Sequence, residues 1–324
     1  MRFSTLKELA ELCTKEKLSI GELMLKEQVR ESGKDEALVW KQMAEYYGIM
    51  KEAVRRGLTE DTTSKSGLTG GDAKRVIRYI QASESALGTE AGTALAYALS
   101  VSEVNASMGR IVATPTAGSC GIIPGVFVSS QERYGWDDDK MVYGLFAAGA
   151  LGYVIANNSF VSGAEGGCQA EVGSAIAMAA GALTEMKGGT PEQAVHAVGL
   201  ALKNSLGLIC DPVAGLVEIP CIVRNGFGAV TALAAADMAL AGVRSVIPSD
   251  EVVQVMLEVG SSMPPKFRET AKGGLAQTPT GKAIMNRLYG KKETADGKKS
   301  SEPAKETATG TAAGTEKGKE SPVK

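Results

Sequence analysis

Apolar residues recur every three or four positions along most of this chain, and they almost never alternate with polar ones. Leu6, Leu9 and Leu12 set that spacing in the first segment. It is the spacing of one face of an α-helix, whereas a strand with one buried face alternates with a period of two. The pattern therefore predicts an all-α protein built as a single compact helical domain.

Helix starts and stops divide this pattern into elements. Two short helices are expected over residues 5–30, the second opening with a capping box from Ser19 to Glu22. Thr190, followed by proline and then by Gln193 at the third helical position, is another strong helix start. Further helices are expected over residues 34–56, 88–104, 141–156, 172–187, 227–241 and 250–263, and a last short one ends near residue 289.

The helix over residues 34–56 is amphipathic and is expected to stop at Gly57, since glycine commonly follows a helix end. Its predicted buried positions are Leu38, Val39, Met43, Tyr46 and Tyr47.

The composition permits a sizeable hydrophobic core that contains few aromatic side chains. Hydrophobic residues make up 44% of the 324 positions and charged ones 22%, while aromatic residues reach only 5% against 39 glycines. The interior is therefore expected to consist of close-packed helices with small residues at their contacts. The balance of 35 basic and 37 acidic residues gives a net charge of −2, which offers no electrostatic argument for binding nucleic acid or an anionic membrane.

Neither a membrane span nor a secretion signal is expected. The closest apolar run, residues 141–156, is shorter than the roughly 18–20 residues that a span needs. The first residues are charged and lack the apolar centre of a signal peptide. The five cysteines are an odd number, which suits a reducing cytoplasm better than a disulfide framework.

The composition changes at residue 291. From there to residue 324 the chain mixes lysine, glutamate, serine, threonine, glycine and alanine without an aromatic residue. Such a segment cannot bury enough apolar surface to fold. We therefore expect one domain over residues 1–290 and a disordered tail over residues 291–324.

Three cysteines stand beside helix breakers. Cys168 follows two glycines, Cys210 precedes Asp-Pro, and Cys221 follows a proline. Thiolates that converge from such turns suggest a metal or an iron–sulfur cluster. The gaps, 210 − 168 = 42 and 221 − 210 = 11 residues, fit zinc less well, because zinc sites usually use close cysteine pairs. Three unrelated core thiols remain an alternative, as does a zinc-stabilised helical protein.

The other two cysteines and the only histidine are expected to be structural. Cys13 lies on an apolar helix face and Cys120 in a glycine-rich loop, and both are predicted to be buried, packed thiols. His196 is predicted to lie on a helix surface rather than in a catalytic site.

Two loops are unusually rich in glycine and hydroxyl residues. Residues 62–72 precede a helix, where successive N–H groups can bind an anion, although a plain loop and helix cap would have the same composition. Residues 105–125 form a long irregular loop, and such loops in compact domains are usually functional.

Three segments carry a family resemblance: SGAEGGCQAEVGSA, LGLICDPVAGLVEIPC and SGLTGGD. In their order and spacing they resemble the iron–sulfur-dependent L-serine dehydratases (L-serine ammonia-lyases), specifically the alpha chain of the two-chain form. The resemblance covers about residues 15–285. It implies a [4Fe–4S] cluster on Cys168, Cys210 and Cys221 that leaves one iron without a protein ligand. It also implies a substrate pocket bordered by Ser66, Thr69, Gly70, Gly71, Thr116 and Gly118.

The implied reaction is the conversion of L-serine to pyruvate and ammonia, in amino-acid degradation and gluconeogenesis. The open iron would act as a Lewis acid on the β-hydroxyl group. No base for the α-proton stands out in this chain, so a separate beta chain is expected to supply it. Glu165 or Glu171 is a candidate for holding the substrate ammonium group.

A non-catalytic iron–sulfur scaffold or sensor is the alternative to this enzyme. Single-chain relatives end in a cysteine that reaches the active site, whereas this tail has none.

Overall fold

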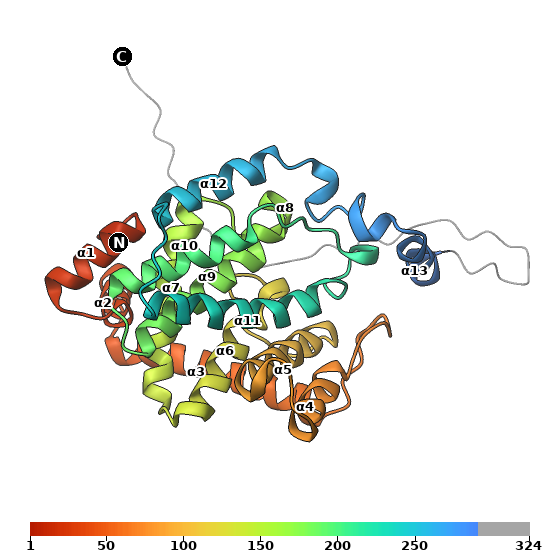
Figure 1. Cartoon of the computed structure of the whole chain (residues 1–324), viewed down its shortest axis with the longest axis horizontal. Helices are drawn as coiled ribbons and strands as arrows, with labels where there is room; N and C mark the ends of the chain where they lie inside the picture. Colours follow the sequence, from red (N-terminus) through yellow and green to blue (C-terminus); the bar gives the residue numbers. More distant parts are fainter. Residues whose placement is uncertain (291–324) are drawn as a thin grey trace, which may run out of the picture. The chain divides into compact units, whose positions relative to one another are not determined.

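The computed structural model describes residues 1–290, of which Met1–Tyr289 form one unit. These residues contain thirteen α-helices and no strand, only an isolated bridge between Cys210 and Arg268 (Figure 1). The all-α prediction is confirmed. The tail that the sequence predicts to be disordered lies outside the described residues.

Most helices follow one another through short connections, while the longer ones after α5, α10 and α12 carry turns of 3₁₀-helix. The first seven are α1 (Leu6–Glu16), α2 (Ile20–Ser32), α3 (Glu36–Thr59), α4 (Asp72–Ala82), α5 (Gly88–Ala106), α6 (Ile122–Tyr134) and α7 (Asp138–Asn158). The remaining six are α8 (Gly163–Gly166), α9 (Cys168–Met186), α10 (Pro191–Ser205), α11 (Cys221–Leu240), α12 (Ser249–Ser262) and α13 (Pro279–Tyr289).

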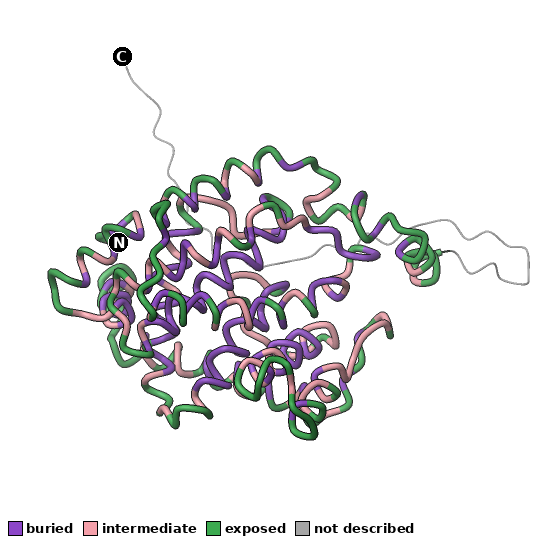
Figure 2. Tube along the Cα trace, viewed as in Figure 1, coloured by how far each residue is buried: buried purple, intermediate pink, exposed green. Residues whose placement is uncertain are grey.

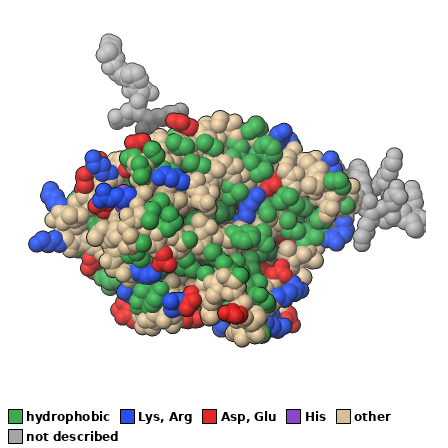
Figure 3. Space-filling model, in the orientation of Figure 1, with side chains coloured by type: hydrophobic (Ala, Val, Ile, Leu, Met, Phe, Trp, Pro, Cys, Tyr) green, Lys and Arg blue, Asp and Glu red, His purple; other side chains and the backbone are tan. Residues whose placement is uncertain are grey.

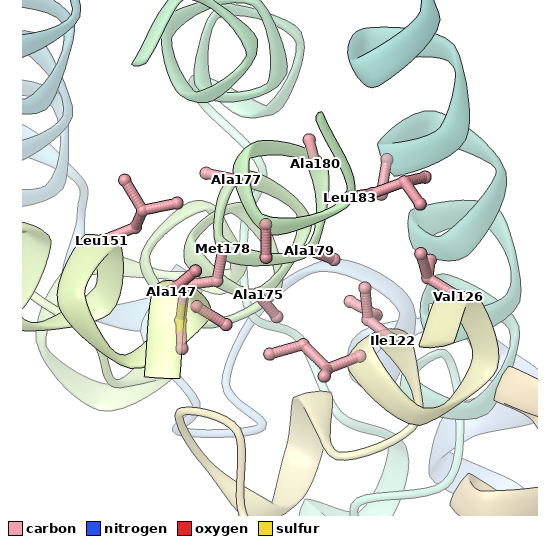
Figure 4. Close-up of a cluster of buried hydrophobic side chains, with 14 of the residues drawn as sticks. Ile122, Val126, Ala147, Leu151, Ala175, Ala177, Met178, Ala179, Ala180 and Leu183 are labelled. Carbon is pink, nitrogen blue, oxygen red and sulfur yellow. The ribbon is translucent and has the colours of Figure 1, made fainter. Parts of the chain in front are cut away.

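Helix α9 is the centre of the fold. Of its residues only Glu185 is not fully buried, and Figure 2 shows it as a nearly continuous buried tube. It packs against α6, α7, α10 and α11. Figure 4 shows how alanines of α9, such as Ala175 and Ala179, lie among larger side chains from the neighbouring helices. A helix that is apolar all round belongs in a core, so α9 fixes the positions of the elements around it.

Small residues allow the helices to approach closely, as the composition predicts. A Cβ atom at Gly181 of α9 would lie 2.4 Å from Leu151 Cδ1, and one at Gly125 of α6 would lie 2.7 Å from Ala98 Cβ. These distances are shorter than a van der Waals contact, so a side chain at either position would push two helices apart.

Helix α3 departs from its prediction at its end and on its surface. It continues through Gly57 to Thr59, and Gly57 lies where α3 packs closely against α5. A Cβ at Gly57 would lie 2.4 Å from the Ser100 carbonyl oxygen, so the glycine is needed for this contact and does not end the helix. Val39 and Tyr47 are buried and Met43 is half-buried. Leu38 and Tyr46 were expected to be buried and are exposed, because α3 is covered on a narrower face than its apolar pattern indicates.

The long loop predicted over residues 105–125 is shorter than expected, because α6 already begins at Ile122 and Pro124 lies in its first turn, where proline is tolerated. Among the described helices, α7 alone is long and apolar enough to cross a membrane by length and composition, and 61% of its apolar window is buried inside the fold.

Candidate metal centre and active site

Two of the candidate cysteines are the first residues of long helices. Cys168 opens α9 directly after Gly167, whose φ of 75° places it in the region that glycine favours. Cys221 opens α11 directly after Pro220. A helix start carries unpaired N–H groups and the positive end of the helix dipole, which favour a thiolate there, although burial still raises the pKa of Cys221.

Cys210 lies on the connection that follows α10. Its backbone N–H donates to the Phe267 carbonyl at 2.8 Å, and its own carbonyl accepts from the Glu269 N–H at 2.9 Å. This pairing fixes the Cys210 backbone against a segment nearly sixty positions away. It also brings the Glu269 carboxyl group toward the cysteines, and burial raises the pKa of that group.

The sulfur atoms of Cys168 and Cys210 converge with a carboxylate. The ligand atoms of Cys168, Glu171 and Cys210 lie within 4.8 Å of one another, and all three residues are buried. All three candidate cysteines are free and buried. Cys221 stands outside this closest group, but its pKa is raised by burial and then by the negative charge of Cys168, so it borders the same site. The buried Cys-Glu-Cys group could bind a metal ion.

Arg224 supplies the positive charge of the site. Its Nη1 donates to Cys168 Sγ at 3.2 Å, and its Nη2 donates to Asp211 Oδ1 at 3.1 Å. A hydrogen bond from Cys210 and the Arg224 guanidinium lower the pKa of Cys168 against the opposing effect of burial. The pKa of Cys210 is raised, because it donates that hydrogen bond and is itself buried. The protein thus favours one thiolate among the three cysteines.

Glu171 connects the cysteines to one of the two predicted substrate loops. Its carboxylate accepts from the Thr116 hydroxyl group and from the Gly118 N–H, and burial raises its pKa. A Cβ at Gly118 would lie 2.4 Å from Glu171 Oε1, so only glycine permits this approach. The structure therefore brings Thr116 and Gly118 to the edge of the cysteine group.

Asn225, one turn after Cys221, holds the same loop from the other side. It is fully buried. Its Nδ2 donates to the Gly118 carbonyl at 2.7 Å and to the Cys221 carbonyl at 2.9 Å, and its Oδ1 accepts from the Gly121 N–H at 2.9 Å. The sequence interpretation missed this residue; an asparagine four positions after a candidate ligand, on a largely apolar helix, is the signal that could have found it.

The other predicted loop is held by carboxylates of the protein itself. Ser66 Oγ and Thr69 Oγ1 donate to Glu218 Oε2 at 2.8 and 3.0 Å. The N–H groups of Gly71 and of the first residues of α4 point at Glu103, which accepts from Asp72 N at 2.6 Å. Gly70 and Gly71 have φ of 144° and 78°, which allow the loop to turn there. The N–H groups at the start of α4 thus bind an internal anion.

Several other candidates are not members of this group. Glu165 is exposed, and its backbone and side chain both bond to the Ser162 hydroxyl group at the start of α8. His196 is half-buried on α10, where its Nδ1 accepts from the Ser245 N–H. Cys13 and Cys120 are buried as predicted, and burial raises the pKa of each to about 12. A surface groove of about 610 Å³ lies beside Lys187 and contains none of the cysteines.

Comparison with known proteins shows which family the chain belongs to. Residues 15–276 match the family described as serine dehydratase alpha chain. The probable L-serine dehydratase alpha chain of Bacillus subtilis is 48% identical over 89% of this chain and 96% of its own length. The L-serine dehydratase alpha chain of Peptoniphilus asaccharolyticus is 44% identical over 87% of this chain and 96% of its own length.

A longer relative shows the same similarity over part of its length. The L-serine dehydratase of Streptomyces coelicolor is 43% identical over 85% of this chain, and the match spans 60% of that protein. Residues 15–276, which match the family, contain the three candidate cysteines and both loops. On this evidence the chain belongs to the serine dehydratase alpha-chain family.

Proposed function

We propose that this protein is the alpha chain of an L-serine dehydratase, a lyase that converts L-serine to pyruvate and ammonia in the cytoplasm, in amino-acid degradation that feeds gluconeogenesis. The observation that carries the proposal is the group of buried free cysteines at the starts of α9 and α11, joined through Glu171 to the loop that carries Thr116.

The donor set fits an iron–sulfur cluster. Three buried thiols lie together, two of them the first residues of long helices, and the hydrogen bond from Cys210 and the Arg224 guanidinium favour the thiolate of Cys168. Cys168, Cys210 and Cys221 would hold a [4Fe–4S] cluster. When bound, such a cluster supplies a Lewis acid for the β-hydroxyl group, because three protein ligands leave one iron open.

The chain's own residues would orient the substrate and exclude water. Thr116 and Gly118 are fixed between Glu171 and Asn225, so the loop has little freedom at the edge of the cysteine group. Arg224 donates hydrogen bonds to Cys168 and to Asp211, and these bonds hold the Cys168 sulfur close to the connection that follows α10. These contacts fix the geometry in which an amino acid would bind beside the cysteines.

A separate beta chain would supply the base that removes the α-proton. The relatives named as alpha chains match over 96% of their length, whereas about two-fifths of the Streptomyces enzyme lies outside the match. An exposed apolar stripe on α11 supports this partner. It begins two residues after Cys221 and consists of Val223, Phe227 and Met238, exposed by 49%, 67% and 44%. Figure 3 shows hydrophobic side chains gathered over α11. Apolar patches of this kind mark protein interfaces.

The proposal is tested on anaerobically purified protein. We expect a brown protein that contains iron, with an absorption spectrum that changes on addition of L-serine. Replacement of Cys168, Cys210 or Cys221 by serine should each abolish iron binding, while Cys13→Ser retains it. A colourless protein, or iron bound equally by all four variants, would contradict the cluster. An absorption spectrum that does not change on addition of L-serine would favour the non-catalytic scaffold or sensor instead.

The beta chain is tested by activity. The isolated chain with its cluster rebuilt should form almost no pyruvate, and addition of the beta chain should restore turnover. Full activity of the isolated chain would disprove the need for this partner.

A further inference from the structure

Glu218 is a buried carboxylate that bridges two parts of the candidate site. It is only 5% exposed. Its Oε2 accepts from the hydroxyl groups of Ser66 and Thr69 at 2.8 and 3.0 Å. Its backbone carbonyl accepts from the Ile222 N–H at 2.9 Å, so Glu218 belongs to the turn that leads into Cys221 and α11. It therefore lies between the Ser66 loop and the third cysteine.

This carboxylate has no cationic partner among residues 1–290. Its two donors are neutral hydroxyl groups, and both use the same oxygen. Among the other buried carboxylates of the region, Asp211 pairs with Arg224, and Glu171 accepts from the Gly118 N–H with Arg224 nearby. Glu103 accepts from the positive end of α4, while its Oε2 has no partner among the described residues. Buried charges in proteins are almost always paired, because an unpaired buried charge loses its hydration and gains no ion pair to offset that loss. The missing partner of Glu218 is thus expected to come from outside residues 1–290.

An amino-acid substrate carries the required group. Its α-ammonium is a compact cation with three N–H donors, and Glu218 Oε1 accepts no hydrogen bond from the described residues. Ser66 and Thr69 hold the other oxygen, so the carboxylate is oriented before the ligand arrives. Preorganisation of this kind reduces the entropy that binding costs. By contrast, Glu165 is exposed and Glu171 already has its own donors.

We propose that Glu218 binds the α-ammonium group of the amino-acid substrate and that Ser66 and Thr69 orient its carboxylate for this task. The inference rests on the proposed function, since it assigns the group that distinguishes an amino acid from a hydroxy acid at the same site. It makes Glu218 a determinant of specificity, whereas a residue that only supported the loop would affect all carboxylate ligands alike.

The test uses the alpha–beta complex with its cluster and two unreactive ligands that differ only in the ammonium group, L-alanine and propanoate. Their dissociation constants are measured by anaerobic calorimetry for the wild type and for Glu218→Gln, which keeps the size of the side chain and one acceptor oxygen. We expect the preference of the wild type for L-alanine to fall about 10- to 100-fold in Glu218→Gln, the range of a hydrogen bond to a charged group. Propanoate binding should be unchanged, and the KM of L-serine should rise by the same factor.

Glu45→Gln, on the exposed face of α3, is the matched control and should retain the preference. If Glu218→Gln does not fold, Ser66→Ala decides, because loss of one orienting donor must still reduce the preference for L-alanine. An equal loss of both ligands, a preference retained in the variant, or no preference in the wild type would overturn the inference. A wild-type complex that forms no pyruvate from L-serine would instead refute the proposed function.

Discussion

Replacement of Asn225 by alanine tests how the loop that carries Thr116 is held beside the cysteines. The Asn225 amide is fully buried and makes three hydrogen bonds, two of them to Gly118 and Gly121 of that loop. Alanine would leave the Gly118 carbonyl and the Gly121 N–H buried without a partner. The substitution therefore removes a link between the loop and the start of α11.

The cost follows from those two groups. A buried polar group left without a hydrogen bond costs about 1–3 kcal/mol, so the pair amounts to about 2–6 kcal/mol. For a domain of this size each kcal/mol lowers Tm by about 2 °C, which predicts a fall of about 4–12 °C. Asn225→Asp should be at least as harmful, because it loses both donors and places a carboxylate against two carbonyl groups.

Urea unfolding followed by circular dichroism measures the effect, with the m-value checked for constancy. Asn157→Ala is the matched control: its Nδ2 also donates to a backbone carbonyl, that of Tyr153 at 2.7 Å, but the side chain is exposed. We expect the control to change the free energy of unfolding by less than about 0.5 kcal/mol. If the two alanine variants were equally stable, the hydrogen bonds of Asn225 would not be what secures the loop.

Three further predictions use the same unfolding assay or a binding assay. Burial raises the pKa of the Glu185 carboxyl group, so the folded state favours its protonated form. The contribution of this group to stability is therefore greatest at low pH and is lost as the pH rises through the pKa of the folded state. Relative to Glu185→Gln, the wild type should lose stability on going from about pH 4.5 to 8. Gly57→Ala should lower the free energy of unfolding by about 1–3 kcal/mol, because the added methyl group would collide with Ser100. Gly149→Ala should raise it by about 0.5–1 kcal/mol, because a Cβ there meets open space. If Gly149→Ala were the less stable of the two variants, the packing argument would be refuted. Phe227→Asp should leave the stability of the isolated chain within about 0.5 kcal/mol and weaken binding of the beta chain in sedimentation experiments, and unchanged binding would exclude the α11 stripe.

Helix starts could be predicted from sequence because their determinants are local. The capping boxes from Ser19 to Glu22 and from Thr190 to Gln193 are both present in the structure, since each is made by residues three positions apart. The end of α3 could not be predicted in the same way. Gly57 is a helix breaker by propensity, but its packing against α5 outweighs a cost of about 1 kcal/mol.

The site shows the same division between local and distant contacts. The turns before Cys168 and Cys221 are visible in the sequence as glycine and proline, although the prediction did not place these cysteines as the first residues of α9 and α11. The anchors of the loops are not visible. Asn225 bonds to a residue 107 positions away, and Ser66 bonds to Glu218 across 152 positions. No periodicity encodes such pairs, because either partner alone is an ordinary polar residue.

The starts of α9 and α11 together hold both of the loops that the sequence predicts to border a substrate pocket. Glu171 and Asn225 lie one turn into α9 and α11 and fix the loop of Thr116, while Glu218 lies one turn before α11 and holds the loop of Ser66. Each anchor is therefore within one helical turn of a candidate ligand. Because a helix transmits a displacement along its axis, a shift of either helix would move a cysteine and a loop together. The positions of the two loops and of the cysteines are thus set by the same packing of α9 against α11.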